Sequence, residues 1–361
     1  MRTERPRVLL IVPRFGSINR GVEVFTAELT SRVDKRRVGI TVLSAPHDQS
    51  VEGVRLLQRR TILRERTERA FANPVVAAVA RRVGIAGETD LETLVLMASS
   101  LADAWSERYD VVLPLGGRWS YLYAAIHRRR GAKVVSVGQG GPSPFALHAS
   151  DIFVGLTPSA IEEASRLHPG IPTRLIPNGV DLGLFKPPPL RPPAPEKVIL
   201  SVGALNRDKR HDLLLDAAMQ LPDTVSVCCV GDGPERAALT AHPLCKAGRL
   251  GFAKFRHADM PSCYREADLF SLASPNEAFG IVFLEALASG LNVVTHDAPR
   301  QRFVVGDVGF YCNVYDTSSY AAALHSAMLA TDKARNIAHA TSFRWDRIIR
   351  QYEDLFRELC A

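Results

Sequence analysis

The chain has 361 residues, 46% hydrophobic and 23% charged, with a formal net charge of +7 at pH 7. These values are typical of a globular protein, and the length suffices for two domains with separate cores. The first apolar run, residues 8–12, ends at Pro13. It is too short for the apolar part of a signal peptide, which needs about 7–15 residues, or for a membrane span of about 20. We therefore expect a cytoplasmic protein, and peripheral binding to the inner face of the membrane is compatible with this expectation.

Short β-branched runs alternate with helical patterns from end to end. The expected strands are residues 7–12, 38–43, 110–115, 133–137 and 153–156, followed by 198–202, 225–230, 269–272, 292–295 and 309–313. Continuous apolar strands separated by helices of about 10–20 residues indicate parallel sheets that are covered by helices on both faces.

A proline-rich segment at residues 186–195 separates two halves of similar size, because proline lacks the N–H that a helix interior or central strand requires. The sequence thus predicts an α/β protein with two Rossmann-like, doubly wound domains that face each other across a cleft. We assign residues 1–180 to the first domain and 181–342 to the second. Residues 343–361 have apolar side chains at helical spacing, and this helix could pack back on the first domain.

Arginines concentrate between residues 55 and 82, at positions Arg55, Arg59, Arg60, Arg64, Arg66, Arg69, Arg81 and Arg82. Between them stand Leu56, Leu57, Ile62 and Leu63, a pattern that would give one apolar and one cationic helix face. The segment could be a solvated helix surface, or it could contact an anionic acceptor or a membrane.

The segment 274–290 has the pattern of a ligand-binding loop that leads into a helix. A strand ends near residue 273, the loop presents Glu277, and a helix begins near Phe279 and Gly280. Free N–H groups at such a helix start bind anions, and glycine lets a phosphate approach the backbone. Glu285, inside the helix, could accept hydrogen bonds from a ribose, while Glu277 could reach a sugar.

Two further loops follow strands. The segment 201–212 carries Arg207, Lys209 and Arg210, and such cations suit a diphosphate whose negative charge grows as it leaves. A basic surface turn is the alternative. The loop at residues 13–25 contains Gly16 and Gly21 before a helix, but neither G-x-G-x-x-G nor G-x-x-x-x-G-K-[ST] occurs in the chain.

In their order and spacing these segments resemble the large fourth family of retaining glycosyltransferases, which has the GT-B fold. The resemblance extends over nearly the whole chain. The matching pieces are Ile176–Asp181 with Phe185 and Pro187, Gly203 with Lys209, Gly231–Glu235, Leu250 with Gly251, Tyr264 with Ala267 and Asp268, and Glu277 with Glu285.

The resemblance implies transfer of a sugar, such as a hexose, from a UDP-, GDP- or ADP-linked donor with retention of configuration, without a metal or a cofactor. The second domain would bind the donor, and the first would bind an unidentified acceptor; no nucleic acid is expected as a partner. Lys209, with Gly203 beside it, would bind the diphosphate, and Glu277 would lie near the sugar. Phe279, Gly280, Ile281 and Val282 would offer backbone N–H groups, Glu285 would hold the ribose, and Gly21 would line the phosphates.

Three positions depart from the family pattern. Arg20-Gly21 stands where a double glycine is usual, and Ala204 replaces a common arginine, whose role Arg207 could take. Gln139 stands where the family often has a histidine near the reacting sugar; it could hydrogen-bond a hydroxyl but could not act as a base. His148 nearby is better interpreted as a surface or core histidine.

Two other functions remain open. A sugar-nucleotide epimerase or hydrolase could share the fold, although the spacing of Glu277 and Glu285 argues against it. A non-catalytic nucleotide-sugar-binding protein would also be compatible with Ala204 and Gln139.

Overall fold

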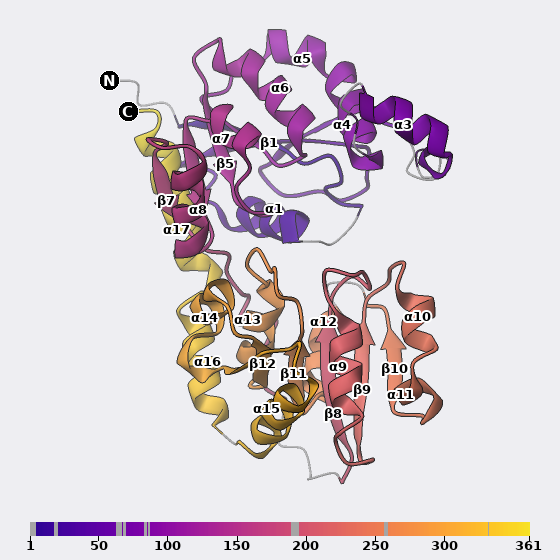
Figure 1. Ribbon diagram of the computed structural model, residues 1–361. Coiled ribbons are helices and arrows are strands. Elements are labelled where there is room, and N and C mark those ends of the chain that lie inside the picture. Colours follow the sequence, from indigo (N-terminus) through magenta and orange to yellow (C-terminus); the bar gives the residue numbers. More distant parts are fainter. Residues whose placement is uncertain are drawn as a thin grey trace. The chain divides into compact units, whose positions relative to one another are not determined.

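The computed structural model describes residues 5–17, 21–62, 67, 70–82, 85, 87–188, 195–255, 259–330 and 332–361. The chain divides into two compact units (Figure 1). Unit 1 contains Met1–Ile176 and Asp346–Ala361, and unit 2 contains Pro177–Trp345. Each unit has its own parallel sheet.

The sheet of unit 1 has seven strands in the order β3-β2-β1-β4-β5-β6-β7, and every paired neighbour is parallel. The strands are β1 (Arg7–Ile11), β2 (Gly39–Ser44), β3 (Arg55–Gln58), β4 (Val111–Pro114), β5 (Lys133–Val137), β6 (Ile152–Gly155) and β7 (Thr173–Leu175). From β1 the chain builds the sheet in one direction, and from β4 in the other. This reversal is characteristic of a doubly wound fold.

Helices cover both faces of this sheet. The described helices of unit 1 are α1 (Gly21–Arg32), α3 (Pro74–Arg82), α4 (Glu88–Ser99), α5 (Leu101–Ser106), α6 (Arg118–Arg128), α7 (Pro144–His148), α8 (Pro158–Leu167) and α17 (Trp345–Glu358). Leu9 and Ile11 pack in one cluster with side chains of α4, α5 and α6. The alternate residues Val8 and Leu10 are buried as well, so the other face of β1 is also covered. Figure 1 shows α1 and α6 on opposite sides of β1.

The C-terminal helix α17 belongs to unit 1, although its residues follow unit 2 in the chain. Its apolar stripe is buried, and the Tyr352 ring lies 5.2 Å from the Phe25 ring of α1. The buried carboxylate of Glu353 accepts hydrogen bonds from the Asp34 backbone N–H and the Arg37 guanidinium, both at 2.8 Å. The helical spacing of residues 345–359 thus correctly predicts this helix.

The sheet of unit 2 has six parallel strands in the order β10-β9-β8-β11-β12-β13. They are β8 (Lys197–Val202), β9 (Val225–Val230), β10 (Leu250–Ala253), β11 (Leu269–Leu272), β12 (Asn292–His296) and β13 (Phe310–Cys312). The helices are α9 (His211–Ala218), α10 (Arg236–Thr240), α11 (Pro243–Lys246), α12 (Met260–Glu266), α13 (Ile281–Ala288), α14 (Pro299–Val305), α15 (Thr317–Leu329) and α16 (Lys333–Thr341), with the 3₁₀ turn η2 (Gly306–Val308). Helices α9 and α15 pack together on a core that includes Ile199 and Tyr320.

All ten expected strands are present, with ends that differ by one residue at most, and three strands were missed. The missed strands β3, β7 and β10 each lie at the edge of a sheet. An edge strand is only partly buried, so it does not need a continuous apolar run; Thr173-Arg174-Leu175 in β7 is partly or fully exposed at every position.

The prediction of an arginine-rich helix is wrong for residues 55–58, which form strand β3. The arginines there are engaged in ion pairs: the Arg55 guanidinium lies 3.0 Å from a Glu107 oxygen, and Arg59 donates two hydrogen bonds to Asp103, at 2.7 and 2.6 Å. Leu63, Arg64, Arg66 and Arg69 of this segment lie outside the described residues, as do Arg20 and residues 189–194 of the proline-rich segment.

None of the helices in the described part of the chain combines the length and apolar character that crossing a bilayer requires.

Candidate active site

The candidate site in unit 2 lies where the winding of the sheet reverses. Strands β8 and β11 are neighbours, and the chain leaves β8 toward β9 but leaves β11 toward β12. The connections that follow the two strands therefore run in opposite directions, and the carboxyl ends at such a switch point are where doubly wound folds bind ligands. The first loop carries Gly203 and Lys209, and the second carries Glu277 and Gly280.

The two loops meet through Lys209 and Glu277. The ammonium group of Lys209 donates a hydrogen bond to Glu277 Oε1, and the side chain of Glu277 is buried. The Asn206 side chain accepts from the Lys209 backbone N–H at 3.2 Å, which orders the turn before the lysine. Two side chains separated by 68 positions in the chain thus form one charged pair at the switch point.

Helix α13 starts beside this pair. Its N-cap, Gly280, has φ 77°, a left-handed conformation that favours glycine. A Cβ at this position would come within 2.6 Å of the Phe283 ring. Ile281 and Val282 are only partly buried, in contrast to the fully buried residues that follow them. The helix thus begins where the sequence predicts, and the first N–H groups of a helix have no partner within it.

Glu285 is held by a buried tyrosine. Its side chain is 6% exposed, and its Oε2 accepts a hydrogen bond of 2.6 Å from the Tyr264 hydroxyl of α12. Burial, and then the neighbouring charge of Glu285, raise the pKa of Tyr264 far above its usual value, so this tyrosine stays a donor. The Tyr264 ring packs against Phe185 and Phe270, with centroids 5.5 and 6.0 Å away. Tyr264 is one of the positions that match the family pattern, but sequence reasoning gave it no role.

Glycines bring the loops after β8 and β9 together. The N–H groups of Gly203 and Leu205 donate to the carbonyls of Val230 and Asp232, both at 3.0 Å. Gly231 has φ 148°, and a Cβ there would come within 1.9 Å of the Gly203 carbonyl oxygen. The motif at residues 231–235 thus supports the backbone on which Lys209 stands.

The basic residues around Lys209 point in different directions. Arg207 is 90% exposed, and its guanidinium lies 3.6 Å from Glu235. Arg210 has φ 49°, which is rare for a residue other than glycine, and it pairs with Asp212 at 2.8 Å. Of the three cations in this loop, Lys209 is the one that the structure brings to Glu277.

Unit 1 gathers its own candidate residues at the carboxyl ends of its strands. Gly21 is the first residue of α1, after β1, and Gln139 follows β5. A Cβ placed on Gly21 would lie 4.0 Å from Gln139 Oε1, so the two residues are neighbours. His148 is exposed, and its Nδ1 lies 2.8 Å from the Pro144 carbonyl oxygen of its own helix.

Within the ranges that the structure describes, no group of three or more His, Cys, Asp or Glu side chains is placed to hold a metal ion.

Residues 185–342, which contain the whole of this unit 2 site, match the family Glycosyl transferases group 1. The match concerns the domain that carries Lys209, Glu277 and Glu285. The D-inositol 3-phosphate glycosyltransferase of Thermobispora bispora is 30% identical over 241 residues, which cover 58% of this chain and 56% of that protein. The protein of that name from Corynebacterium urealyticum is 34% identical over 190 residues, which cover 46% and 44%. The chain thus spans about half the length of the curated relatives it matches.

Solved structures agree over the full length. Anabaena Alr3699/HepE in complex with UDP and glucose has a TM-score of 0.74 and 18% identity, covering 98% of this chain and 100% of that one. Sucrose-phosphate synthase from Thermosynechococcus elongatus has a TM-score of 0.73 and 20% identity, covering 98% and 99%. The fold is therefore GT-B, as the resemblance in the sequence implies.

Proposed function

We propose that the chain is a retaining glycosyltransferase that moves a sugar from a nucleotide-diphosphate sugar to an acceptor hydroxyl. The observation that carries this proposal is the Lys209–Glu277 pair beside the start of α13, the helix that also carries the Tyr264-bound Glu285. The family match of residues 185–342 supports the same chemistry.

In this proposal the donor lies at the carboxyl ends of β8 and β11 in unit 2. The ammonium of Lys209 has three donors, so it can hold a phosphate oxygen as well as Glu277. The N–H groups of Gly280, Ile281 and Val282 bind the other phosphate oxygens, and Glu285 accepts hydrogen bonds from the ribose. A UDP-sugar is the first donor to test, because a protein of similar fold is described in complex with UDP and glucose.

The reaction breaks the bond between the sugar C1 and the diphosphate oxygen and forms a bond from the acceptor oxygen to C1 on the same face. The acceptor proton passes to a phosphate oxygen of the leaving diphosphate. Lys209 and the N–H groups at the start of α13 stabilise the negative charge that develops on this oxygen. Such stabilisation by fixed donors is usually the largest single contribution to the rate enhancement of an enzyme. This positive field is why we propose that no metal ion is needed.

Lys209→Ala and Glu277→Ala test the assignment, with Lys254→Ala as a control. Lys254 is an exposed lysine of the same unit whose partner is Asp232 at 3.4 Å. We expect each site variant to lower kcat/KM about 100-fold or more with unchanged thermal stability, and the control to match the wild type. Site variants with near-normal turnover would contradict the assignment, as would a product of inverted configuration.

Three measurements, of the products, of ligand binding and of activity in EDTA, separate this proposal from its rivals. Release of free sugar or of an epimer, without a new glycosidic bond, would favour a hydrolase or epimerase. Binding of a nucleotide sugar without any turnover would favour a non-catalytic protein. Activity lost in EDTA and restored by magnesium or manganese would refute the metal-independent mechanism.

The acceptor requires its own screen. The relatives that the chain matches are named D-inositol 3-phosphate glycosyltransferases, so inositol phosphates are the first acceptors to test. Since the match covers only about half of those proteins, we propose no specific acceptor.

A peripheral membrane contact through unit 1 is the second part of the proposal, and helix α3 carries it. Val75 and Val79 are 69% and 57% exposed, and Arg81 and Arg82 follow in the last turn. Exposed apolar side chains beside basic ones are typical of helices that lie on anionic membranes. We expect co-sedimentation with anionic but not neutral vesicles, lost at high salt and in Val75→Ser/Val79→Ser. Absence of binding at low salt would contradict it.

A further inference from the structure

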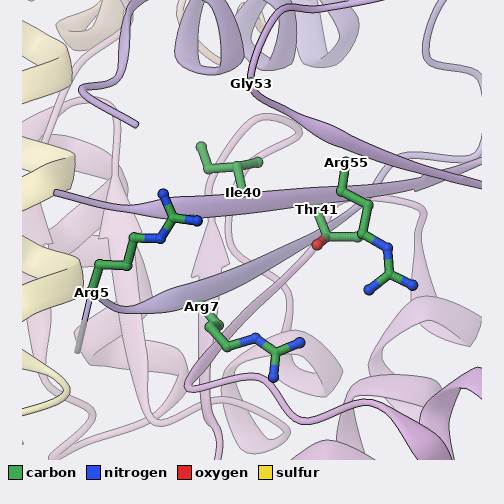
Figure 2. Close-up of a pocket in the computed structure, with 7 residues that line it drawn as sticks. Arg5, Arg7, Ile40, Thr41, Gly53 and Arg55 are labelled. Carbon is green, nitrogen blue, oxygen red and sulfur yellow. The ribbon is translucent and has the colours of Figure 1, made fainter. Parts of the chain in front are cut away.

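A pocket of about 520 Å³ lies in unit 1 at the amino ends of strands β1, β2 and β3 (Figure 2). Its lining includes Arg5, Arg7, Gly39, Thr41, Gly53 and Arg55. The amino ends of parallel strands all lie at one end of the sheet, and their carboxyl ends lie at the other. The pocket is at the amino ends, whereas Gly21 and Gln139 follow the carboxyl ends, so it is separate from the candidate residues for sugar transfer.

The register of the strands explains why there is a hollow at their amino ends. Arg7 is paired with Gly39, and Thr41 is paired with Arg55 two residues further along. Gly39 therefore leaves the position beside Arg7 without a side chain. Gly53, two residues before Arg55, has φ 68°, and a Cβ there would lie 3.0 Å from Lys35 Cγ. A Cβ on Gly39 would lie 3.5 Å from Arg5 Nε, so it is this glycine that leaves space between the arginines.

Three guanidinium groups surround this space, and among the described residues one carboxylate pairs with two of them. Arg7 and Arg55 share one carboxylate, Glu107, each at 3.0 Å. The hydrogen bond from Arg55 is the largest of the effects that lower the pKa of Glu107, so this group is ionised at neutral pH. Arg5 donates to a neutral group, the Lys35 carbonyl oxygen, at 2.5 Å. Positive charge therefore exceeds negative charge among the side chains that line the pocket.

The arginines are accessible to a ligand. The side chains of Arg7 and Arg55 are 50% and 53% exposed, and Figure 2 shows the three arginine side chains placed around Ile40 and Thr41 of β2. A planar guanidinium offers parallel N–H donors that match two oxygens of a phosphate, and each of these arginines has further donors beyond those named. A pocket of this volume is in the range of small-molecule sites, which is about 300–1,000 Å³.

We propose that this pocket binds a small ligand that carries a phosphomonoester or diphosphate group, at a site distinct from that of the sugar donor. The ligand engages Arg5, Arg7 and Arg55 together and competes with Glu107 for two of them. Removing the arginines therefore weakens binding, whereas removing the charge of Glu107 strengthens it.

The test is calorimetric titration of the full chain with inorganic pyrophosphate at low salt. All variants are made in a Lys209→Ala background, which removes the proposed donor site. We expect Arg5→Gln/Arg55→Gln to weaken binding about tenfold or more, and Glu107→Gln to strengthen it severalfold. Arg36→Gln is the matched control, because Arg36 is 93% exposed and pairs with Asp34 outside the pocket. A stronger-binding Glu107→Gln could not result from partial unfolding.

Hydrogen exchange localises the ligand. Pyrophosphate should protect the amides of residues 34–41 and 51–57. Protection elsewhere, equal affinity in the double arginine variant and its control, or no binding at all would overturn the proposal. If Lys209→Ala alone has no effect on nucleotide-sugar binding, only the proposed donor site is contradicted.

The phosphate could come from a free metabolite or from a lipid headgroup. Vesicles of phosphatidylcholine with and without phosphatidic acid distinguish the two. Binding to phosphatidic acid that is lost in Arg5→Gln/Arg55→Gln but retained in Val75→Ser/Val79→Ser would identify a lipid ligand. Binding of pyrophosphate alone would identify a free one, and both results support the pocket.

Discussion

Replacing Tyr264 with phenylalanine isolates one contact of the candidate site. The substitution removes only the hydroxyl, so the ring can keep its packing against Phe185 and Phe270. Glu285, which is 6% exposed, loses the 2.6 Å hydrogen bond that orients its carboxylate. If Glu285 holds the ribose of the donor, a looser carboxylate should weaken donor binding without affecting the reacting centre directly.

The expected magnitude follows from the burial and charge of this contact. A hydrogen bond to a charged group contributes about 1.5–3 kcal/mol. With about 2–4 °C of Tm per kcal/mol for a domain of this size, Tm should fall by roughly 3–12 °C. Loss of about 1.4 kcal/mol in ribose binding would raise donor KM about tenfold, with a much smaller change in kcat.

Tyr320→Phe is the matched control for this measurement. Tyr320 is also fully buried in unit 2, and its hydroxyl lies 2.6 Å from the neutral Ser271 hydroxyl. The Tyr320→Phe substitution should lower the free energy of unfolding by about 1 kcal/mol and leave donor KM unchanged. Thermal denaturation and steady-state kinetics of both variants provide the comparison. A Tyr264→Phe variant that is destabilised but has normal KM would refute a role in donor binding.

Three further predictions concern the loops and the pH response. Gly231→Ala should destabilise the chain by about 2–3 kcal/mol or more in denaturant titration, because its Cβ would come within 1.9 Å of the Gly203 carbonyl oxygen. Gly21→Ala should leave Tm unchanged or raised, since its Cβ would lie 4.0 Å from Gln139 Oε1 and alanine favours a helix start, while donor KM rises. Burial lowers the pKa of His211 from 6.5 to about 4, so the unfolded state binds a proton at a higher pH than the folded state does. The free energy of unfolding should therefore fall as the pH decreases from 6.5 to about 4, and it should fall less steeply in His211→Asn. Equal slopes in both proteins would contradict the last prediction.

Much of the fold was predictable because its central strands are buried on both faces. Such strands must be continuous apolar runs, and every expected strand is present in the structure. The start of α13 was predictable for a local reason: Gly280 adopts a positive φ at the N-cap, and only glycine does so at little cost. The sequence therefore predicted both the class of fold and the loop that presents Glu277.

Edge strands and long side chains were less predictable. Arg55 is followed by two leucines, and so short a pattern fits either a helix or a partly buried strand. Pairing with the neighbouring strand β2 decides that the segment is a strand. Likewise, Arg207 and Lys209 are equivalent basic residues of one loop in the sequence, but only the fold decides that Lys209 meets Glu277 and that Arg207 lies near Glu235.

By itself the sequence determined the central strands, the order of the motifs and the basic and acidic residues in the loops after the strands, because local backbone preference and burial leave their pattern in neighbouring residues. The tertiary structure alone decided that Tyr264 holds Glu285, and that Arg7 and Arg55 share Glu107 around a pocket at the far edge of the sheet. These contacts join residues that are distant in the chain, and their geometry depends on strand register and helix packing, which no local pattern specifies.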